Sequence, residues 1–545
     1  MMPAFISSSL REYQEKGFNT NCAGAVQYIQ KTGWSQGINR MDWRDPEDWG
    51  NDLYARLANV QHFYNRSVEL EYEFHQGVGL VWRAFQFGLL TDGYGDVPYS
   101  EALSPVDGGT NLFPVFDRQE EVYKGIIDEL KEANDLFSKN IMQYNGIPPN
   151  TAQDLLYGYD PGQWRKLSNS LRLRYYMRLS EKLPDYAKSG IQEIINDLTN
   201  HPIFESNDDD AIMSYLGTAN STSWAGNLTF DNSATPNWNS IILCAGLRDV
   251  LVDFEDPRLP LWFQKVAIRI AIDKSASARR DDTRGGVRYL SQNWCDFEGE
   301  VDDEDTGEPL FDEDTGEPVV KKPYVVYNKD TWVDDNKAGK ILIDTTDYVG
   351  MPLAFSSGNG VEYNLNPNAT QGSRNPHASQ LALMYQEATG PFLKARMITY
   401  AEICFILAEA AQKGWISGAQ DWYEKGVEAS LTYWGLGDEY DAYIQNAGVA
   451  FNSANALEQI ITQKWIANWN IAVESWCDWR RTGLPHFSIG QGCTRNTIPI
   501  RYRYSSNESS RNLANYEAAV NNLEATSASG PEGTDSAWSK IWLLQ

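Results

Sequence analysis

Two stretches of the sequence place indole rings beside polar side chains in loops, a combination suited to holding a sugar. The first is the glycine-containing segment 34–44, whose candidate ligand residues are Trp34, Asn39, Arg40, Asp42 and Trp43. The second lies beyond residue 200, where the candidates are Trp224, Trp238, Trp294 and Trp332, with Arg284 among them. A sugar ring has an apolar C–H face and a rim of hydroxyl groups, so a flat aromatic ring with hydrogen-bonding neighbours can contact both.

Not every aromatic ring can have that role. The chain contains 19 Trp, 29 Tyr and 20 Phe, too many for us to expect that the core of so polar a protein hides them all. The tryptophans at helical spacing are expected in the core; these are Trp49, Trp82, Trp164, Trp465 and Trp469. For each loop tryptophan, packing against the scaffold is the alternative to ligand contact, and we expect about one in three nominated positions to touch a ligand.

Motifs for catalysis are missing from the sequence. It has no GxSxG, GxxxxGK[ST] or HExxH motif, and its five histidines lack metal-ligand spacing. The acidic repeat at 304–309 and 313–318 is interpreted as a solvated turn, because its spacing does not match an EF-hand calcium loop. A carboxylate pair of the glycosidase type stays open as an alternative, although no particular pair stands out. We therefore predict no catalytic residue, no metal site and no cofactor.

The net charge of the chain limits the classes of molecule that it can be expected to bind. Its 545 residues include 46 Lys plus Arg and 74 Asp plus Glu, a formal net charge of −28. Such a surface repels phosphate backbones and anionic lipid headgroups, so we expect neither nucleic-acid binding nor electrostatic membrane docking. No apolar run is long enough to span a bilayer. The six cysteines are widely spaced and do not decide the redox compartment.

Helical periodicity occupies both ends of the chain. Apolar spacing predicts helices beginning after the cap at Asp45 and across 72–90, 117–137, 162–181, 186–198, 396–412, 421–433 and 457–469. Between about 200 and 395 this periodicity lapses into long loops with a few short strands, for example 324–327. The sequence therefore predicts an all-α fold with a large loop-rich insertion. We expect a single domain, 1–545, that consists of an N-terminal scaffold (1–199), an insertion (200–395) and a C-terminal part of the scaffold (396–545).

The C-terminal helices carry residues that identify a family. The segments 395–411, 463–467 (Gln-Lys-Trp-Ile-Ala) and 474–485 (Glu-Ser-Trp-Cys-Asp-Trp-Arg-Arg-Thr-Gly-Leu-Pro) resemble the SusD/RagB family of nutrient-binding outer-membrane lipoproteins. Supporting matches occur in family order at 95–102, 256–260 and 498–502, with Asn512 and Tyr516. Arg480 and Arg481 in these motifs are interpreted as scaffold residues, and Glu402 and Glu409 as partners of neighbouring helices.

The resemblance implies a tetratricopeptide-like scaffold of helix pairs and a loop-rich face that binds oligosaccharide. It further implies a lipid-anchored protein on the surface of a Gram-negative cell, covering a SusC-like TonB-dependent transporter in the outer membrane. The family's signal and acylated cysteine are absent here, so we expect a trimmed chain whose only membrane attachment is a missing N-terminal lipid anchor. The site location, the segment 34–44 and the central loops, is implied by the family, whereas individual ligand residues are not. A glycoside hydrolase on a helical frame and a RagB-like peptide binder are the alternatives.

Overall fold

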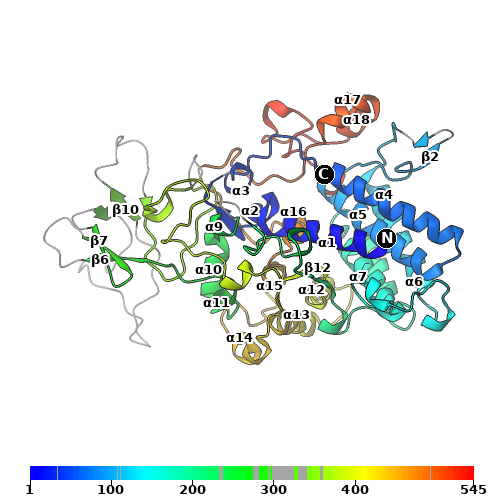
Figure 1. The fold of residues 1–545 in the computed structure, drawn as a ribbon, viewed down its shortest axis with the longest axis horizontal. Helices are drawn as coiled ribbons and strands as arrows, with labels where there is room; N and C mark the ends of the chain where they lie inside the picture. Colours follow the sequence, from blue (N-terminus) through cyan, green and yellow to red (C-terminus); the bar gives the residue numbers. More distant parts are fainter. Residues whose placement is uncertain are drawn as a thin grey trace.

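The computed structural model describes residues 1–33, 35–106, 109–110, 112–231, 237–273, 281–291, 295–297, 325–328, 341–355, 360–490 and 492–545. Long helices fill one end of the molecule and the lower centre of Figure 1, and the short strands β6, β7 and β10 lie at the opposite end. No helix among these residues combines the length and the apolar character needed to cross a membrane.

The first group of helices is α4 (Trp49–Glu69), α5 (Glu73–Tyr94), α6 (Gln119–Leu136), α7 (Pro161–Arg178) and α8 (Pro184–Asn196). Each packs on the next along the chain, as expected for a scaffold of helix pairs. The apolar stripe Trp49, Leu53 and Leu57 of α4 is buried, as its spacing predicts. Helix α5 is buried on nearly all faces because α4 and α6 cover it on two sides. The predicted helices of this region are thus confirmed, with ends shifted by a few residues.

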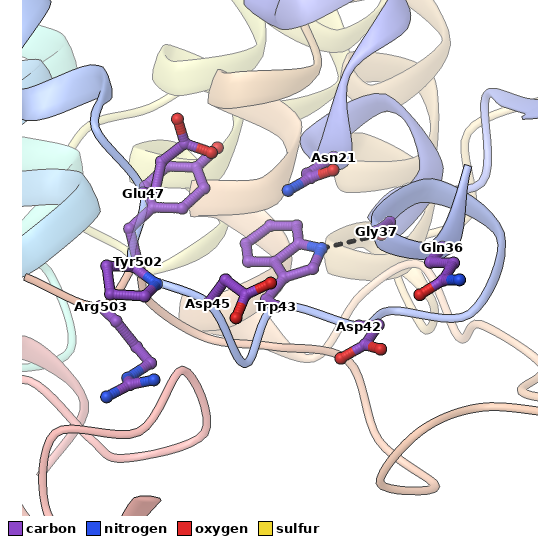
Figure 2. A pocket seen from close by; sticks show the side chains of 10 residues that line it. Asn21, Gln36, Gly37, Asp42, Trp43, Asp45, Glu47, Tyr502 and Arg503 are labelled. Carbon is purple, nitrogen blue, oxygen red and sulfur yellow. Dashed lines mark hydrogen bonds between the residues drawn. The ribbon is translucent and has the colours of Figure 1, made fainter. Parts of the chain in front are cut away.

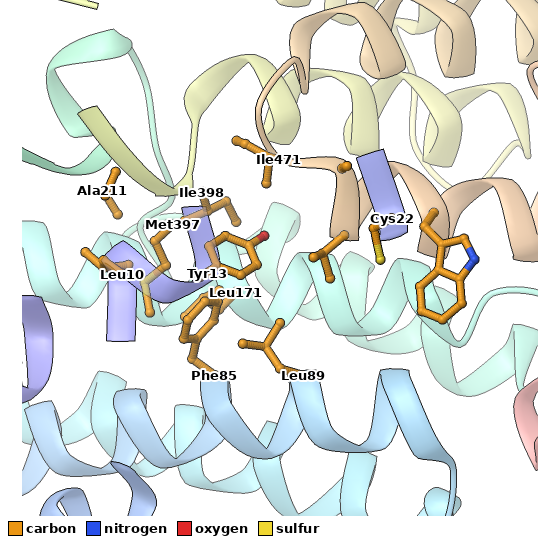
Figure 3. Packing of buried hydrophobic residues seen from close by; sticks show 14 of the residues in the cluster. Leu10, Tyr13, Cys22, Phe85, Leu89, Leu171, Ala211, Met397, Ile398 and Ile471 are labelled. Carbon is orange, nitrogen blue, oxygen red and sulfur yellow. The ribbon is translucent and has the colours of Figure 1, made fainter. Parts of the chain in front are cut away.

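Helix α1 (Met2–Asn19) connects the two helical parts of the chain. Tyr13 on α1 packs against Phe85 of α5, with ring centroids 5.2 Å apart, and Leu10 lies beside Met397 in Figure 3. The Tyr13 hydroxyl donates to Glu474 Oε1 over 3.0 Å, which links α1 to α16 (Ala472–Thr482). The helices from the two ends of the sequence therefore share one core.

The second group of helices is α12 (Tyr400–Gln412), α13 (Ala419–Tyr433), α15 (Ala456–Ala467) and α16, where α12 packs on both α13 and α15. The prediction of a helix from residue 396 was wrong at its start. Residues Lys394–Ile398 form strand β12, which pairs antiparallel with β4 (Ala211–Ser214). Thr399 then caps α12, its Oγ1 accepting a hydrogen bond from the Glu402 amide over 3.3 Å.

Buried ion pairs connect these helices. The Arg174 guanidinium of α7 donates to both carboxylate oxygens of Glu402, at 2.8 and 2.7 Å, and lies 3.4 Å from Glu474. Arg481 makes a similar bidentate pair with Glu409, at 2.5 and 2.7 Å. All five side chains are at most 3% exposed, so these charges lie inside the protein. The scaffold roles predicted for Arg481, Glu402 and Glu409 are confirmed.

The described residues between about 200 and 395 form short strands, short helices and loops. The strands of the molecule are β1 (Ile29–Lys31), β2 (Pro105–Val106), β3 (Gly109–Thr110), β4, β5 (Ile241–Leu243), β6 (Arg269–Asp273), β7 (Asp281–Arg284), β8 (Val287–Ser291), β9 (Cys295–Phe297), β10 (Val325–Asn328), β11 (Ile341–Leu342) and β12. Antiparallel pairing of β1 with β5 joins the central region to the N-terminal part. The predicted strand near 324–327 corresponds to β10, and the acidic repeat at 304–318 lies outside the described residues.

The remaining α-helices are short. They are α2 (Asn21–Ala25), α3 (Gln36–Asn39), α9 (Asn237–Ser240), α10 (Ala245–Asp253), α11 (Leu259–Trp262), α14 (Tyr440–Tyr443), α17 (Ser506–Arg511) and α18 (Leu513–Val520). Helix α3 lies within the segment 34–44 that is predicted to bind a ligand, and α2 packs against it.

Candidate functional site

A polar pocket opens at the segment that follows α3. It has a volume of about 290 Å³ and combines residues 36–47 with one residue of α2 and two residues from near the C-terminus (Figure 2). The lining residues are Asn21, Gln36, Gly37, Asp42, Trp43, Asp45, Pro46, Glu47, Tyr502 and Arg503. We refer to it as the loop pocket.

Glycines allow α2 and α3 to approach closely enough to shape this pocket. A Cβ atom on Gly37 would lie 2.4 Å from Asn21 Oδ1, and one on Gly24 would lie 2.5 Å from the carbonyl oxygen of Ile38. At Gly24 the close atom belongs to the backbone, so a larger residue there would push α3 away from α2, whereas at Gly37 the Asn21 side chain would have to turn aside. The glycine noted in the sequence of segment 34–44 is therefore a packing requirement as well as a loop signal.

The inner wall of the pocket is aromatic. The Trp43 ring is stacked on Tyr502, with ring centroids 5.1 Å apart and an interplanar angle of 11°. Its Nε1 donates to the Gly37 carbonyl oxygen over 2.9 Å, so the ring is fixed by packing and by a hydrogen bond. Trp43 is only 4% exposed, and it therefore offers the pocket an edge in place of an open face.

Three polar side chains of the loop pocket are uncommitted, which here means that they have no hydrogen-bond or ion-pair partner among the described residues. Among the described residues, the side chains of Asn21, Gln36 and Asp45 make no hydrogen bond and no ion pair. In Figure 2 they surround the Trp43 ring, with Asp45 in front of it in this view. An amide can donate and accept while a carboxylate accepts, so these three groups can satisfy hydroxyl groups of a ligand.

The other charged groups of the pocket are already paired. Arg44 donates to both oxygens of Asp42, at 2.6 and 2.8 Å, and these hydrogen bonds hold the pKa of Asp42 below its ordinary value. Glu47 Oε1 accepts from Lys16 Nζ over 3.2 Å, and Arg503 Nε donates to the Asp535 carbonyl oxygen over 2.7 Å. These pairs hold the walls of the pocket and leave the three uncommitted side chains for a ligand.

The structure places the candidates of segment 34–44 in different roles. Asp42 and Trp43 line the loop pocket. Asn39 is 4% exposed and its amide bonds both backbone groups of Lys31, at 2.9 and 2.6 Å, so its ligand role is corrected to a structural one. Arg40 is half-buried and its carbonyl accepts from the Thr494 amide. Trp34 lies outside the described residues.

The central candidates do not form open platforms where the structure describes them. Trp224 is 1% exposed and packs against Phe18, with ring centroids 4.7 Å apart. Trp238 is 2% exposed, with the Arg374 guanidinium 5.8 Å from its ring centroid. The expectation that these two rings face a ligand is corrected, because their partners from distant segments cover them. Trp294 and Trp332 lie outside the described residues.

Several pocket residues were missed at the level of sequence. The cap predicted at Asp45 is wrong, because α4 begins only at Trp49 with Asp48 as its cap; Asp45 and the nearby Glu47 line the pocket. Tyr502 belongs to a family motif that was interpreted as scaffold. No local signal connects Tyr502 and Arg503 with segment 36–47, because only the tertiary fold brings them together.

The arrangement is suited to binding. Within the described part of the chain, no group of three or more His, Cys, Asp or Glu residues could hold a metal ion. Cys22, Cys244, Cys404, Cys477 and Cys493 are buried and free, and burial raises the pKa of the Cys22 thiol to about 12, which keeps it protonated beside Tyr502. An aromatic edge with uncommitted amide and carboxylate groups defines a binding protein with a loop-built site on a scaffold of helix pairs.

Comparison with known proteins identifies the family. The model of the SusD-like family, described as starch-binding and associating with the outer membrane, matches residues 3–278 and 326–505. The chain belongs to this family, and it is accordingly an outer-membrane-associated protein of the glycan-binding, SusD-like type. The resemblance found in the sequence is thereby confirmed.

Solved structures share the whole fold. A chitin-binding protein is 22% identical with a TM-score of 0.69, covering 100% of this chain and 99% of its own. A SusD homologue from Bacteroides fragilis is 21% identical with a TM-score of 0.65, covering 99% of each chain. A chitin-binding SusD homologue from Flavobacterium johnsoniae is 18% identical with a TM-score of 0.66, covering 100% and 98%. No curated protein matches the chain.

Proposed function

We propose that this chain is a non-catalytic receptor that captures neutral oligosaccharides at the cell surface, with the loop pocket as one contact site. The observation that supports this is the set of three uncommitted polar side chains, Asn21, Gln36 and Asp45, around the edge of Trp43. A saccharide can bring a C–H face to the ring edge and hydroxyl groups to the amides and the carboxylate.

The expected affinity is modest. Each aromatic contact contributes about 0.5–1.5 kcal/mol and each hydrogen bond about the same, so a few of them give dissociation constants in the millimolar to micromolar range. Weak binding suits a protein that captures a ligand and then releases it. We propose further that the recipient is a SusC-like TonB-dependent transporter and that a lipid anchor at the N-terminus holds the receptor at the outer membrane.

The proposal is tested by isothermal titration of the full chain with neutral oligosaccharides, beginning with chito-oligosaccharides because two similar structures are named chitin-binding. Replacing Gln36 or Asp45 by alanine should weaken binding roughly two- to tenfold each, since each removes one hydrogen-bonding group. The matched controls are Gln445→Ala and Asp128→Ala, which alter exposed residues outside the loop pocket.

Three outcomes would contradict the proposal. Release of new reducing ends on long incubation, abolished by a single Asp or Glu substitution, would favour a hydrolase. Thermal stabilisation by peptides and not by sugars would favour a peptide binder. Full affinity in both Gln36→Ala and Asp45→Ala would exclude the loop pocket as a contact site. The same titration of Trp34→Ala, Trp43→Ala, Trp294→Ala and Trp332→Ala tests whether those rings contribute to binding.

A further inference from the structure

A second and larger cavity lies apart from the loop pocket. It has a volume of about 830 Å³ and runs between α10, the segment 346–353 and the segment 485–490 that follows α16. We call it the α10 cleft. None of its lining residues lines the loop pocket. Its volume falls in the range of about 300–1,000 Å³ that is usual for small-ligand sites.

Direct backbone contacts fix two walls of the α10 cleft. A Cβ atom on Gly350 would lie 2.7 Å from Ala245 Cα, and one on Gly490 would lie 2.4 Å from the carbonyl oxygen of Leu353. The Gly490 amide also donates to that same carbonyl over 3.2 Å. Because only glycine permits these approaches, the three segments touch backbone to backbone, and the cleft is preformed.

A buried arginine adds a third link between the walls. The Arg248 guanidinium of α10 donates to Asp344 Oδ2 over 2.8 Å and to the Tyr348 carbonyl oxygen over 3.0 Å. Gln27, which follows α2, completes the support, its Nε2 donating to the Ser488 carbonyl oxygen over 2.7 Å. The positive charge of Arg248 is thus used inside the wall and is not offered to a ligand.

The lining of the α10 cleft is mainly apolar. Tyr348 and Phe487 are half-buried, and Ile489 is 37% exposed at the edge. Phe487 is supported from behind by Trp465 and Trp479, with ring centroids at 5.7 and 6.3 Å. Rings that are fixed on one side and open on the other can accept the C–H face of a sugar with little loss of side-chain entropy.

Polar groups at the rim are uncommitted. Within the described residues, the side chains of Asp253, His486 and Ser488 make no hydrogen bond and no ion pair, and all three are exposed. The other two carboxylates of the lining are paired, Asp249 with Arg248 at 2.5 Å and Asp347 with Lys265 at 2.7 Å, so they are not free for a ligand. A purely apolar ligand would gain nothing from these hydrogen-bonding groups.

We propose that the α10 cleft is a second glycan site, which binds a neutral oligosaccharide independently of the loop pocket. This inference rests on the proposed function and adds a separate site to it. Hydroxyl groups would pair with the rim side chains while the C–H faces lie on Tyr348 and Phe487. Two separate sites on one rigid chain would let a long glycan be held at two points, which raises its apparent affinity above that of either site.

The test uses the full chain and short chito-, cello- and malto-oligosaccharides in isothermal titration. The double variant Gln36→Ala/Asp45→Ala weakens the loop pocket, and Phe487→Ala and Asp253→Ala are then added to it singly. We expect the double variant to retain a measurable site, and each added substitution to weaken that site at least threefold. Asp128→Ala added to the double variant is the matched control and should change nothing. Asp253 is exposed, so its variant remains informative if Phe487→Ala does not fold.

The outcomes separate the two proposals. If the double variant binds no oligosaccharide, or if its residual binding is unaffected by both Phe487→Ala and Asp253→Ala, the α10 cleft is not a glycan site, and the proposed function stands. If no neutral oligosaccharide binds the unmodified chain, the proposed function itself fails. Binding of peptides in place of sugars at the cleft, detected by their sensitivity to Phe487→Ala, would also overturn the inference.

Discussion

The helical frame and the loop face use polar side chains in opposite ways. In the frame, Arg174, Glu402 and Glu474 are buried and satisfied by one another. In the loop pocket, Asn21, Gln36 and Asp45 line a cavity and bond nothing else that the structure describes. The charges that hold this fold together and the polar groups available for a ligand therefore form separate sets, so stability and binding should respond to different substitutions.

Removing a buried charge from the helical frame should have the largest effect on the stability of the protein. Arg174→Met removes the partner of the buried Glu402 carboxylate and one of the two arginines beside Glu474, which keeps Arg178, and should lower the free energy of unfolding by about 3–5 kcal/mol. Arg66→Met is the control: its pair with Glu69 is exposed, 58% and 63%, and should contribute less than about 1 kcal/mol. Urea unfolding of both variants measures the difference. Equal losses would show that the buried pairs do not stabilise the frame.

Lowering the pH should have the second-largest effect, a loss of stability of the helical frame. Burial opposes ionisation of Asp478, but Lys464, Arg481 and Arg178 outweigh it and lower its pKa; Arg174 and Arg178 do the same for Glu474. A lowered pKa in the folded state means that stability is present above the unfolded value, near pH 4, and is lost as pH falls below it. Each carboxylate should contribute a slope of up to about 1.4 kcal/mol per pH unit.

Thermal unfolding between about pH 7 and pH 3 tests this expectation. Asp478→Asn should flatten the acid limb of the curve, whereas Asp128→Asn, at an exposed position, should leave it unchanged. Because burial raises the pKa of other carboxyls, such as Asp210 to about 8, the readout is the difference between each variant and the unmodified chain; an acid limb unchanged by Asp478→Asn would contradict the assignment of Asp478 as stabilising.

A smaller effect is expected where the two regions meet. Gly37→Ala places a Cβ 2.4 Å from Asn21 Oδ1, so the Asn21 side chain has to turn aside, and the change should cost about 1 kcal/mol of stability or less while weakening glycan binding severalfold. The double variant Asn21→Ala/Gly37→Ala removes the clash and should recover the stability but not the affinity, because the Asn21 amide is lost. Gly390→Ala, whose nearest atom at 3.3 Å is a flexible leucine side chain, is the control. Recovery of neither property would mean that Asn21 does not determine the fit of α3.

Raising the salt concentration should have the smallest effect, a small change in the affinity for a neutral ligand. A neutral ligand exchanges no charge with the pocket, so raising ionic strength from about 0.05 to 0.5 M should change its dissociation constant by less than about twofold. The same titration with a sulfated oligosaccharide is the comparison, since repulsion by Asp45 and by the net charge of −28 should make its binding weak and dependent on salt. Strong salt dependence for a neutral sugar would contradict the described charge pairing.

The helical frame was predictable because the apolar spacing that specifies each helix lies within a short stretch of sequence. The spacing of Trp49, Leu53 and Leu57 specifies one face of α4 whatever covers that face. One exception has a tertiary cause. The start of the helix predicted at 396 is a strand because β4 supplies backbone partners. Helix α1 was not predicted individually, although its buried residues Phe5, Ile6, Leu10 and Tyr13 have the spacing of one helix face.

The site was predictable only as a location. Segment 34–44 does border a pocket, but whether a loop indole is open or covered depends on residues far away in sequence. Trp43 is covered by Tyr502, and Trp224 by Phe18 and Tyr385. The uncommitted side chains of Gln36 and Asp45 can be recognised only when the hydrogen bonds of their neighbours are known.

The loop pocket unites residues near the start of the chain with Tyr502 and Arg503 near its end. A ribosome or an export channel that holds back the last part of the polypeptide therefore also holds back one wall of the cavity. The cavity is therefore complete only when synthesis and export are essentially complete, and a nascent or prematurely shortened molecule lacks the wall formed by Tyr502 and Arg503.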